Sequence, residues 1–308
     1  MRFFALIPVL FGISLVAFLS MALCPGDAAK ISLMSQMEAE APPPAAVEDL
    51  RREMGLDRPL AVQYAFWVKR ICRGDLGRSY QTGRSVVQEL SRAFPATALL
   101  ATVSMLLTIL IVIPAGVTSA VKKGSLWDKS TLAGSLALIA SPNFFLAIIL
   151  ILFFSIRWRI LPVAGYGEAR SLILPSLALA LSNAAISTRL MRTSTLEVLG
   201  EKFITVARAK GIGERLVIWK HTLRSAFIPL TAYLGTQFGY LFGGAAVVES
   251  IFLWPGLGRL LVDSVRTRDL FVVQGCILAI ACSYVLINLM ADLLHALLDP
   301  RVRHAAHG

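Results

Sequence analysis

Residues 94–121 read FPATALLATVSMLLTILIVIPAGVTSAV, and this run contains no charged side chain. The hydrocarbon core of a membrane is about 30 Å thick and is crossed by about 20 helical residues. Backbone groups that lie in lipid must find their hydrogen bonds within the same segment, which favours a helix. The run therefore predicts a membrane-spanning helix and places the chain among membrane proteins.

Five further apolar runs are long enough to cross the membrane, which predicts an all-α polytopic membrane protein with six transmembrane helices. The expected spans are Phe3–Leu23, Phe94–Val121, Ser130–Ile156, Ser171–Thr188, Ala226–Val248 and Phe271–Leu298. The first run also fits a cleavable signal peptide, but it is long for one and lacks a clean cleavage site, so we favour a retained helix. Proline interrupts four of the spans and permits a kink in each, at Pro114, Pro142, Pro175 and Pro229.

The composition agrees with a membrane location. Of the 308 residues, 56% are hydrophobic and 16% are charged, and the mean hydropathy is +0.69. Soluble domains are about 45–50% apolar and about 25% charged. Lys and Arg number 30 against 19 Asp and Glu, for a formal net charge of +11. In a soluble protein that excess would suggest nucleic acid. In a membrane protein it indicates basic cytoplasmic loops, so we expect membrane lipid and no nucleic acid as a partner.

Loop charge predicts the orientation of the chain. The loop 122–129 and the stretch 189–224 are both basic, and Arg301 and Arg303 follow in the tail. Under the positive-inside rule these segments lie in the cytoplasm, and so do both termini. The short loop around Arg157 on the opposite side is also basic and agrees less well with the rule.

This topology divides the chain into transmembrane helix 1 (1–23), an extracytoplasmic subdomain (24–93), a five-helix core (94–298) with a cytoplasmic loop (194–225), and a cytoplasmic tail (299–308). The subdomain contains a proline-rich linker and two expected helices, Val47–Met54 and Val62–Ile71. About seventy residues hold only a small core, so the subdomain is expected to lean on the membrane helices or on a partner. A Cys24–Cys72 bridge is left open.

The sequence carries no motif for catalysis or nucleotide binding. A phosphate-cradling Gly-x-x-x-x-Gly-Lys-Ser/Thr loop, a His-Glu-x-x-His metal site and a Gly-x-Ser-x-Gly nucleophile elbow are all absent. The four cysteines show no metal-site spacing, and the four histidines are scattered. We therefore expect no catalytic residue, no metal ligand and no cofactor site in this chain.

The cytoplasmic loop 194–225 is the most informative stretch. Helical spacing places apolar side chains on one face of each of two short pieces, Phe203, Val206 and Ala207 in the first and Leu216, Trp219 and Leu223 in the second. A Gly-Ile-Gly turn at 211–213 separates the pieces, so we expect two short helices with a basic rim. Such a structure suits docking of a soluble subunit, and an amphipathic helix at the membrane surface accounts for the residues equally well.

Short motifs follow one another along nearly the whole chain: GLDRPL at 55–60, GDLGRSY at 74–80, FPAT at 94–97, LPVAGYG at 161–167, ARAKG at 207–211, HTLR at 221–224, WPGLGR at 254–259 and LDPRVR at 298–303. Together they resemble the permease subunits of ABC importers that carry dipeptides, oligopeptides or nickel. Several motifs in the same order are far more specific than any one of them alone.

The resemblance implies that the loop docks as a coupling helix into a groove on a cytoplasmic ATPase subunit. The resemblance assigns this role to Ala207, Arg208, Lys210 and Gly211, and the remaining candidates of the coupling loop are Thr205, Ala209 and Arg215. Gly211 would allow the turn, and Arg208 and Lys210 would supply charge complementarity. The general importer signature begins with glutamate where this chain has Thr205, so a salt bridge from that position is not available.

The resemblance also implies a complex in the bacterial inner membrane. This chain would form half of the translocation pathway, and a homologous second permease would complete it. Two cytoplasmic ATPase subunits would bind ATP and Mg²⁺, and an extracytoplasmic solute-binding protein would deliver the cargo. Di- or oligopeptides are the expected substrate, with nickel or a nickel chelate as the alternative. A stand-alone secondary transporter is a further alternative, although it would need paired repeats and ionisable residues in the membrane.

The fifth span carries a glycine pattern. Gly235, Gly239 and Gly243 are spaced four residues apart and form a smooth helix face that permits close packing. The packing partner is either another helix of this chain or the partner permease. Gln237 lies off that face and is a candidate for lining the pathway.

Candidate residues for an outer gate follow the fifth span. Glu249 is an acid at the membrane boundary and is either a pathway residue or a helix-end residue that reaches water. Trp254, Pro255 and Gly256 suit a short outer segment that dips toward the pore. An interfacial anchor is the alternative for the tryptophan.

Overall fold

A computed structural model describes all residues except 1, 23–29, 31–32, 35–41, 54–56 and 299–308. The described residues are mainly helical. They form two compact units, one made of Met1–Thr97 with Pro255–Ser283 and the other of Ala98–Trp254 with Tyr284–Gly308. Each unit is built from two separate stretches of the chain, because residues 255–283 group with the first 97 residues. The division expected from the sequence used continuous stretches only.

The first unit contains α1 (Arg2–Ala22), α3 (Pro44–Glu53) and α4 (Leu60–Cys72). The last two overlap the helices expected at 47–54 and 62–71. Tyr64 and Trp67 of α4 place their rings 5.4 and 5.7 Å from the ring of Phe18 on α1. The Trp67 indole also donates a hydrogen bond to Gln274 on α14 (Leu270–Leu298), at 3.2 Å. α4 therefore packs against α1 and α14 of its own chain.

Buried polar contacts fix the remaining elements of this unit, which are α13 (Leu257–Arg266) and the starts of α5 (Val86–Val121) and α14. Ser79 Oγ donates to buried Asp269 at 2.5 Å, just before α14 begins. The first amide of α13 donates to Thr97 Oγ1 on α5, at 2.8 Å. A buried polar group that lacks such a partner costs free energy, so these contacts hold the loop 74–85 and α13 in place.

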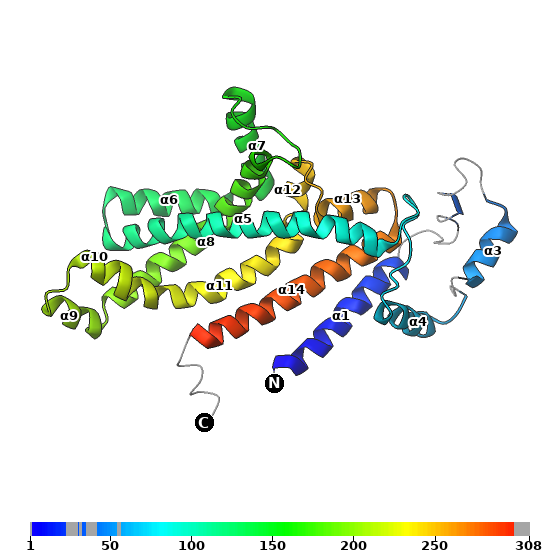
Figure 1. Cartoon of the computed structure of the whole chain (residues 1–308), viewed down its shortest axis with the longest axis horizontal. Helices are drawn as coiled ribbons and strands as arrows, with labels where there is room; N and C mark the ends of the chain where they lie inside the picture. The colour runs from blue at the N-terminus through cyan, green and yellow to red at the C-terminus, as the bar shows by residue number, and fades with distance from the viewer. Residues whose placement is uncertain (1, 23–29, 31–32, 35–41, 54–56, 299–308) are drawn as a thin grey trace. The chain divides into compact units, whose positions relative to one another are not determined.

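The second unit is organised around α8 (Ala169–Leu199), which packs on α6 (Leu126–Ala140), α7 (Asn143–Leu150) and α11 (Leu223–Gly244). Many buried positions of α8 have small side chains: Ser176, Ala178, Ala180, Ala184, Ala185 and Ser187. Small side chains let neighbouring helices approach closely. Figure 1 shows the hairpin of α9 (Lys202–Ala209) and α10 (Glu214–Leu216) beyond the joined ends of α8 and α11.

The expected span Ser130–Ile156 is broken at Pro142, one of the four prolines expected to permit a kink. α6 ends at Ala140, and a second apolar piece begins with α7 and continues as the π-helix η1 (Ile151–Arg157). The two pieces are bent by 109° relative to each other. Pro142 occupies the break, where its missing N–H and fixed backbone angle oppose a continuous helix. Figure 1 shows α7 turning away from the direction of α6.

Several helices of the structure are candidates for membrane spans. Within the described residues, α5, α8 and α14 are long and apolar enough to cross a membrane, and the bent pair would be a fourth span. α1 provides a shorter apolar stretch, Pro8–Ser20. α11 is 22 residues long but includes Thr231, Thr236 and Gln237, which lower its hydropathy. Six spans and cytoplasmic termini therefore stay a prediction.

Several features expected from the sequence lie outside the described residues. These are Met54 as the last residue of the first helix expected in the subdomain, Cys24 as a possible partner of Cys72, and the basic tail from residue 299 onward.

Candidate functional site

The chain between α8 and α11 folds into a helical hairpin, here called the 202–222 hairpin. Its first arm is α9, and its second arm is α10 followed by the π-helix η2 (Val217–Thr222). Gly211 has a φ of +77°, a conformation that glycine adopts far more easily than other residues. The amide of Ile212 donates to Ala207 O at 3.3 Å, and that of Gly211 donates to Arg208 O at 2.9 Å. This pair of bonds is the Schellman motif, by which Gly211 ends α9 and reverses the chain.

A small apolar core holds the hairpin together. Ile204, Ala207 and Val217 are buried, and they pack with the half-buried Ile212 of the turn. Val198 and Leu199, the last residues of α8, contact the same cluster. The hairpin is therefore attached to the end of α8 by side-chain packing as well as by the chain.

Both arms of the hairpin also expose large apolar side chains. Its exposed side chains are Phe203 (46% exposed), Val206 (53%), Leu216 (50%) and Trp219 (49%). We call these four residues the apolar face. The expected grouping of Phe203, Val206 and Ala207 on one side is wrong for Ala207, because the second arm covers that side of α9 and buries it with Ile204. Leu223, expected beside Leu216 and Trp219, is half-buried at the start of α11.

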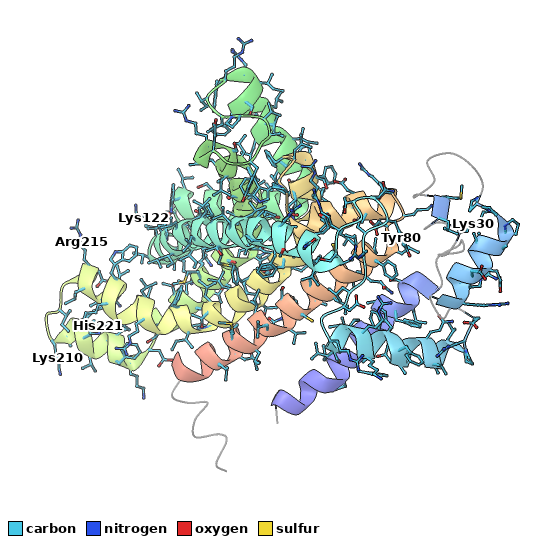
Figure 2. The ribbon with its side chains drawn as sticks, turned by 45° about the vertical axis from the view of Figure 1, so that its right-hand side comes forward. Lys30, Tyr80, Lys122, Lys210, Arg215 and His221 are labelled. Carbon is cyan, nitrogen blue, oxygen red and sulfur yellow. The ribbon has the colours of Figure 1, made fainter. Side chains whose placement is uncertain are left out.

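The rim of the hairpin carries the predicted charges. Arg208 forms a bidentate ion pair with Glu214 across the turn, with N–O distances of 2.7 and 3.1 Å. The guanidinium hydrogen bonds lower the pKa of the Glu214 carboxyl, and the carboxylate raises the pKa of Arg208. Figure 2 shows Lys210 and Arg215 at the outer end of the hairpin, where both are exposed. Thr205 and Ala209 are exposed on α9.

The glycines predicted to pack occupy different environments in α11. A Cβ atom on Gly235 would collide with Ala291 of α14, and one on Gly239 would lie 3.1 Å from the ring of Tyr284 on the same helix. Gly243, in contrast, is exposed. The first two glycines therefore allow α14 to approach α11. Gln237 donates to the hydroxyl of Tyr233 at 2.8 Å and is half-buried.

The candidate gate residues lie in and after α12 (Ala246–Ile251), which follows a break at Ala245 near the end of the fifth predicted span. Glu249 is fully buried, so the alternative of a helix-end residue that reaches water is wrong. Trp254 is 2% exposed, donates its amide to Glu249 O at 2.8 Å, and packs edge-on against Tyr166, with 4.8 Å between ring centroids. A buried tryptophan does not serve as an interfacial anchor. Pro255 is exposed, and Gly256 is the buried N-cap of α13.

The structure reveals one polar pair that the sequence does not. Buried Asp128 and half-buried Arg192 form a bidentate ion pair, whereas the sequence presents both only as charges of expected cytoplasmic loops. The single signal in the sequence was an isolated acid beside three lysines in the loop 122–129. Such a signal identifies no partner 64 residues away.

Comparisons with known proteins agree with this architecture. The family described as binding-protein-dependent transport system inner membrane component matches residues 112–304, and the N-terminal component of the same transport systems matches residues 1–101. The glutathione transport system permease protein GsiC of Escherichia coli O6:H1 is 40% identical over 303 residues, which cover 98% of this chain and 97% of that protein. GsiC of Pectobacterium atrosepticum is 39% identical over the same coverage.

Two solved transporters share the fold at low sequence identity. The MetNI methionine ABC transporter, in inward-facing conformations, aligns with a TM-score of 0.60 at 19% identity, covering 69% of this chain and 97% of that chain. An amino acid ABC transporter with histidines aligns with a TM-score of 0.52 at 15% identity, covering 70% of this chain and 94% of that chain.

Proposed function

The chain belongs to the family of binding-protein-dependent transport system inner membrane components, and from that premise we propose that it carries short peptides and is driven through its 202–222 hairpin. The coarser part of this statement follows from the family. The chain is an ABC-importer permease subunit and a multi-pass protein of the bacterial inner membrane. Such permeases are transporters rather than catalysts and work with ATPase and substrate-binding partners.

The hairpin is proposed as the coupling element because some of its apolar residues form a buried core while others are exposed. Ile204, Ala207 and Val217 give it a core of its own, so it is ordered without a partner. The apolar face nevertheless leaves four large side chains exposed at the surface of a short hairpin. Clustered exposed apolar side chains mark a surface that binds another protein or a membrane. Exposed Lys210 and Arg215 beside this face favour a partner groove with an acidic rim.

The remaining partners are proposed from the resemblance. Two cytoplasmic ATPase subunits bind ATP and Mg²⁺, a homologous second permease supplies the other half of the pathway, and a solute-binding protein delivers cargo on the outer side. Gly243 is available to the second permease because it is exposed. Gln237 is proposed to line the pathway. Buried Glu249 and Trp254, with Pro255 and Gly256, are proposed as the outer gate.

The substrate class rests on the relatives. The GsiC proteins are named for glutathione, which is a tripeptide, and they match this chain over almost its full length. This supports a short peptide as cargo, with glutathione as the first compound to test. The relatives do not favour the nickel alternative.

The proposal is tested by reconstitution. The chain is co-expressed with its neighbouring permease, ATPase and binding-protein genes, and the purified complex is placed in proteoliposomes. We expect uptake of radiolabelled glutathione or of a short peptide that requires ATP and the binding protein, and no uptake of nickel. Uptake driven by an ion gradient in the absence of any ATPase would show that the chain is a secondary transporter instead.

A further inference from the structure

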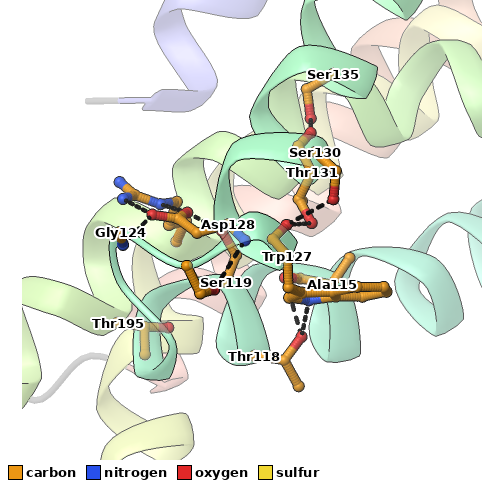
Figure 3. Close-up of polar contacts among 12 residues, drawn as sticks. Ala115, Thr118, Ser119, Gly124, Trp127, Asp128, Ser130, Thr131, Ser135 and Thr195 are labelled. Carbon is orange, nitrogen blue, oxygen red and sulfur yellow. Dashed lines mark hydrogen bonds and ion pairs between the residues drawn. The ribbon is translucent and has the colours of Figure 1, made fainter.

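The Asp128 carboxylate, which is paired with Arg192, accepts four hydrogen bonds. Arg192 Nε and Nη2 donate to the two carboxylate oxygens of Asp128, at 2.7 and 2.8 Å. The side chains are 17% and 4% exposed, respectively. Figure 3 shows Ser119 and Gly124 beside the Asp128 carboxylate, with dashed lines marking the hydrogen bonds. Ser119 Oγ donates to Oδ1 at 2.5 Å, and the Gly124 amide donates to Oδ2 at 2.9 Å.

These bonds join three helices at one end of the second unit. Ser119 lies near the end of α5, Gly124 lies in the turn between α5 and α6, and Asp128 lies in the first turn of α6. Arg192 comes from α8. Gly124 adopts a φ of +81°, which brings its amide toward the carboxylate. Asp128 is therefore a junction that fixes the α5–α6 turn to α8.

The junction lies close to the hairpin along α8. Val198 and Leu199, which pack into the hairpin core, follow Arg192 by six and seven residues. At 1.5 Å per helical residue this is about 9–10 Å. A displacement of the hairpin therefore acts first on the end of α8 and reaches Arg192 within two helical turns.

Stability alone gives a weak reason for this arrangement. Desolvation of the buried carboxylate and of the half-buried guanidinium offsets much of their attraction, and an apolar pair of similar size would hold the helices together as well. What the ion pair adds is a fixed geometry, because a guanidinium fork and a carboxylate bond in one plane. The helices α5 and α6 thereby follow α8 as one body.

We propose that Asp128 and Arg192 are positioning residues for coupling, which pass the movement of the hairpin and α8 on to α5 and α6. This inference rests on the proposed function of the hairpin. Transmission between distant sites requires packed elements that move together, and the junction supplies that link at the end where the force enters. Without the junction, ATP hydrolysis would move α8 while α5 and α6 lag behind.

The test uses the reconstituted complex with two variants. Asp128→Asn keeps the size of the side chain but loses its charge, and Arg192→Lys keeps the charge but loses the planar fork. Lys129→Gln is the matched control, because it removes an exposed charge next to Asp128 without touching the pair. We measure the amount of assembled complex, the rate of ATP hydrolysis and the uptake per ATP hydrolysed.

We expect both variants to hydrolyse ATP while uptake per ATP falls by about fivefold or more, the lower end of common coupling energies, and the control to behave as the wild type. A second measurement covers the case in which a variant assembles poorly. Nucleotide binding should change the amide hydrogen exchange of the α5–α6 turn in the wild type. In Arg192→Lys the change should be confined to α8 and the hairpin.

The proposal is overturned if the assembled variants keep the wild-type uptake per ATP, or if they only lower the amount of complex. It is also overturned if nucleotide binding alters the α5–α6 turn equally with and without the intact pair. A failure of the proposed function would look different, since the wild-type complex itself would then show no ATP-driven uptake.

Discussion

A substitution in the core of the 202–222 hairpin tests whether this core keeps the hairpin folded. Ile204 is fully buried between the arms of the hairpin. The change Ile204→Ala removes three carbon atoms, which at about 0.8 kcal/mol for each buried methylene corresponds to about 2.4 kcal/mol. The cavity left behind adds to this, and measured values span about 2–5 kcal/mol. The core is small and can collapse, so we expect about 2–3 kcal/mol.

A loss of this size raises the population of the locally opened hairpin by about 30- to 150-fold, since each 1.4 kcal/mol is a factor of ten in an equilibrium constant. Amide hydrogen exchange detects it directly. The amide of Ile212 bonds to Ala207 O, and that of Val217 bonds to Gly213 O. Both should exchange faster by this factor in Ile204→Ala, while amides in the buried part of α8 keep their rates.

Val206→Ala is the matched control, because this β-branched residue lies on the same short helix with its side chain exposed. It should leave hydrogen exchange nearly unchanged and weaken only the association with the ATPase. Uptake should fall in both variants, through disorder in one and through lost contact in the other. Equal exchange rates in the two variants would refute the assignment of Ile204 to the core and Val206 to the apolar face.

Three further predictions follow from single contacts. Thr97→Val removes the acceptor of the first amide of α13, and leaving that buried N–H unpaired should lower its protection from exchange by about 1–3 kcal/mol. Gly211→Val places a β-branched residue at a φ of +77° and should cost the hairpin about 1–3 kcal/mol, lowering uptake per ATP. The control Gly213→Val lies at a φ of −59° with open space around its Cβ and should be tolerated. The lowered pKa of Glu214 means that its pair with Arg208 stabilises the hairpin above the ordinary carboxyl pKa and is lost as pH falls through the lowered one. Exchange measured from pH 6 down to pH 3 should show a loss below about 1 kcal/mol for this exposed pair, and none in Arg208→Gln.

The sequence was most informative where a pattern is local. Apolar runs gave the positions of α5, α8 and α14, and amphipathic spacing gave α4. These elements follow from residues a few positions apart, whose burial depends mainly on their own helix. The Gly211 turn was equally accessible, because a glycine between two helical pieces is a local signal of a left-handed residue.

The failures arose where distant parts of the chain decide the outcome. Ala207 shares a face with Phe203 and Val206 by spacing, but the second arm of the hairpin selects which side of α9 is buried. Pro142 indicated a possible kink in the span 130–156, yet neither the proline nor the hydropathy of the run predicts a bend as large as 109°. The partner of Asp128 could not be found because ion pairing across 64 residues leaves no periodic trace.

The charge pattern of the hairpin refines what its partner must offer. The resemblance to ABC permeases suggested that Arg208 and Lys210 both supply charge to the ATPase, but Arg208 already pairs with Glu214 within the hairpin. An acidic residue of the partner would have to displace Glu214 from Arg208. The hairpin already holds Glu214 in place, whereas ordering side chains of the partner at a new interface costs entropy. We therefore propose that Arg208 braces the turn and that the charge for docking to an ATPase lies on exposed Lys210 and Arg215. Hence charge reversal at Lys210 and Arg215 should slow association with the ATPase and leave the hairpin ordered, whereas reversal at Arg208 should loosen the hairpin before any partner is present.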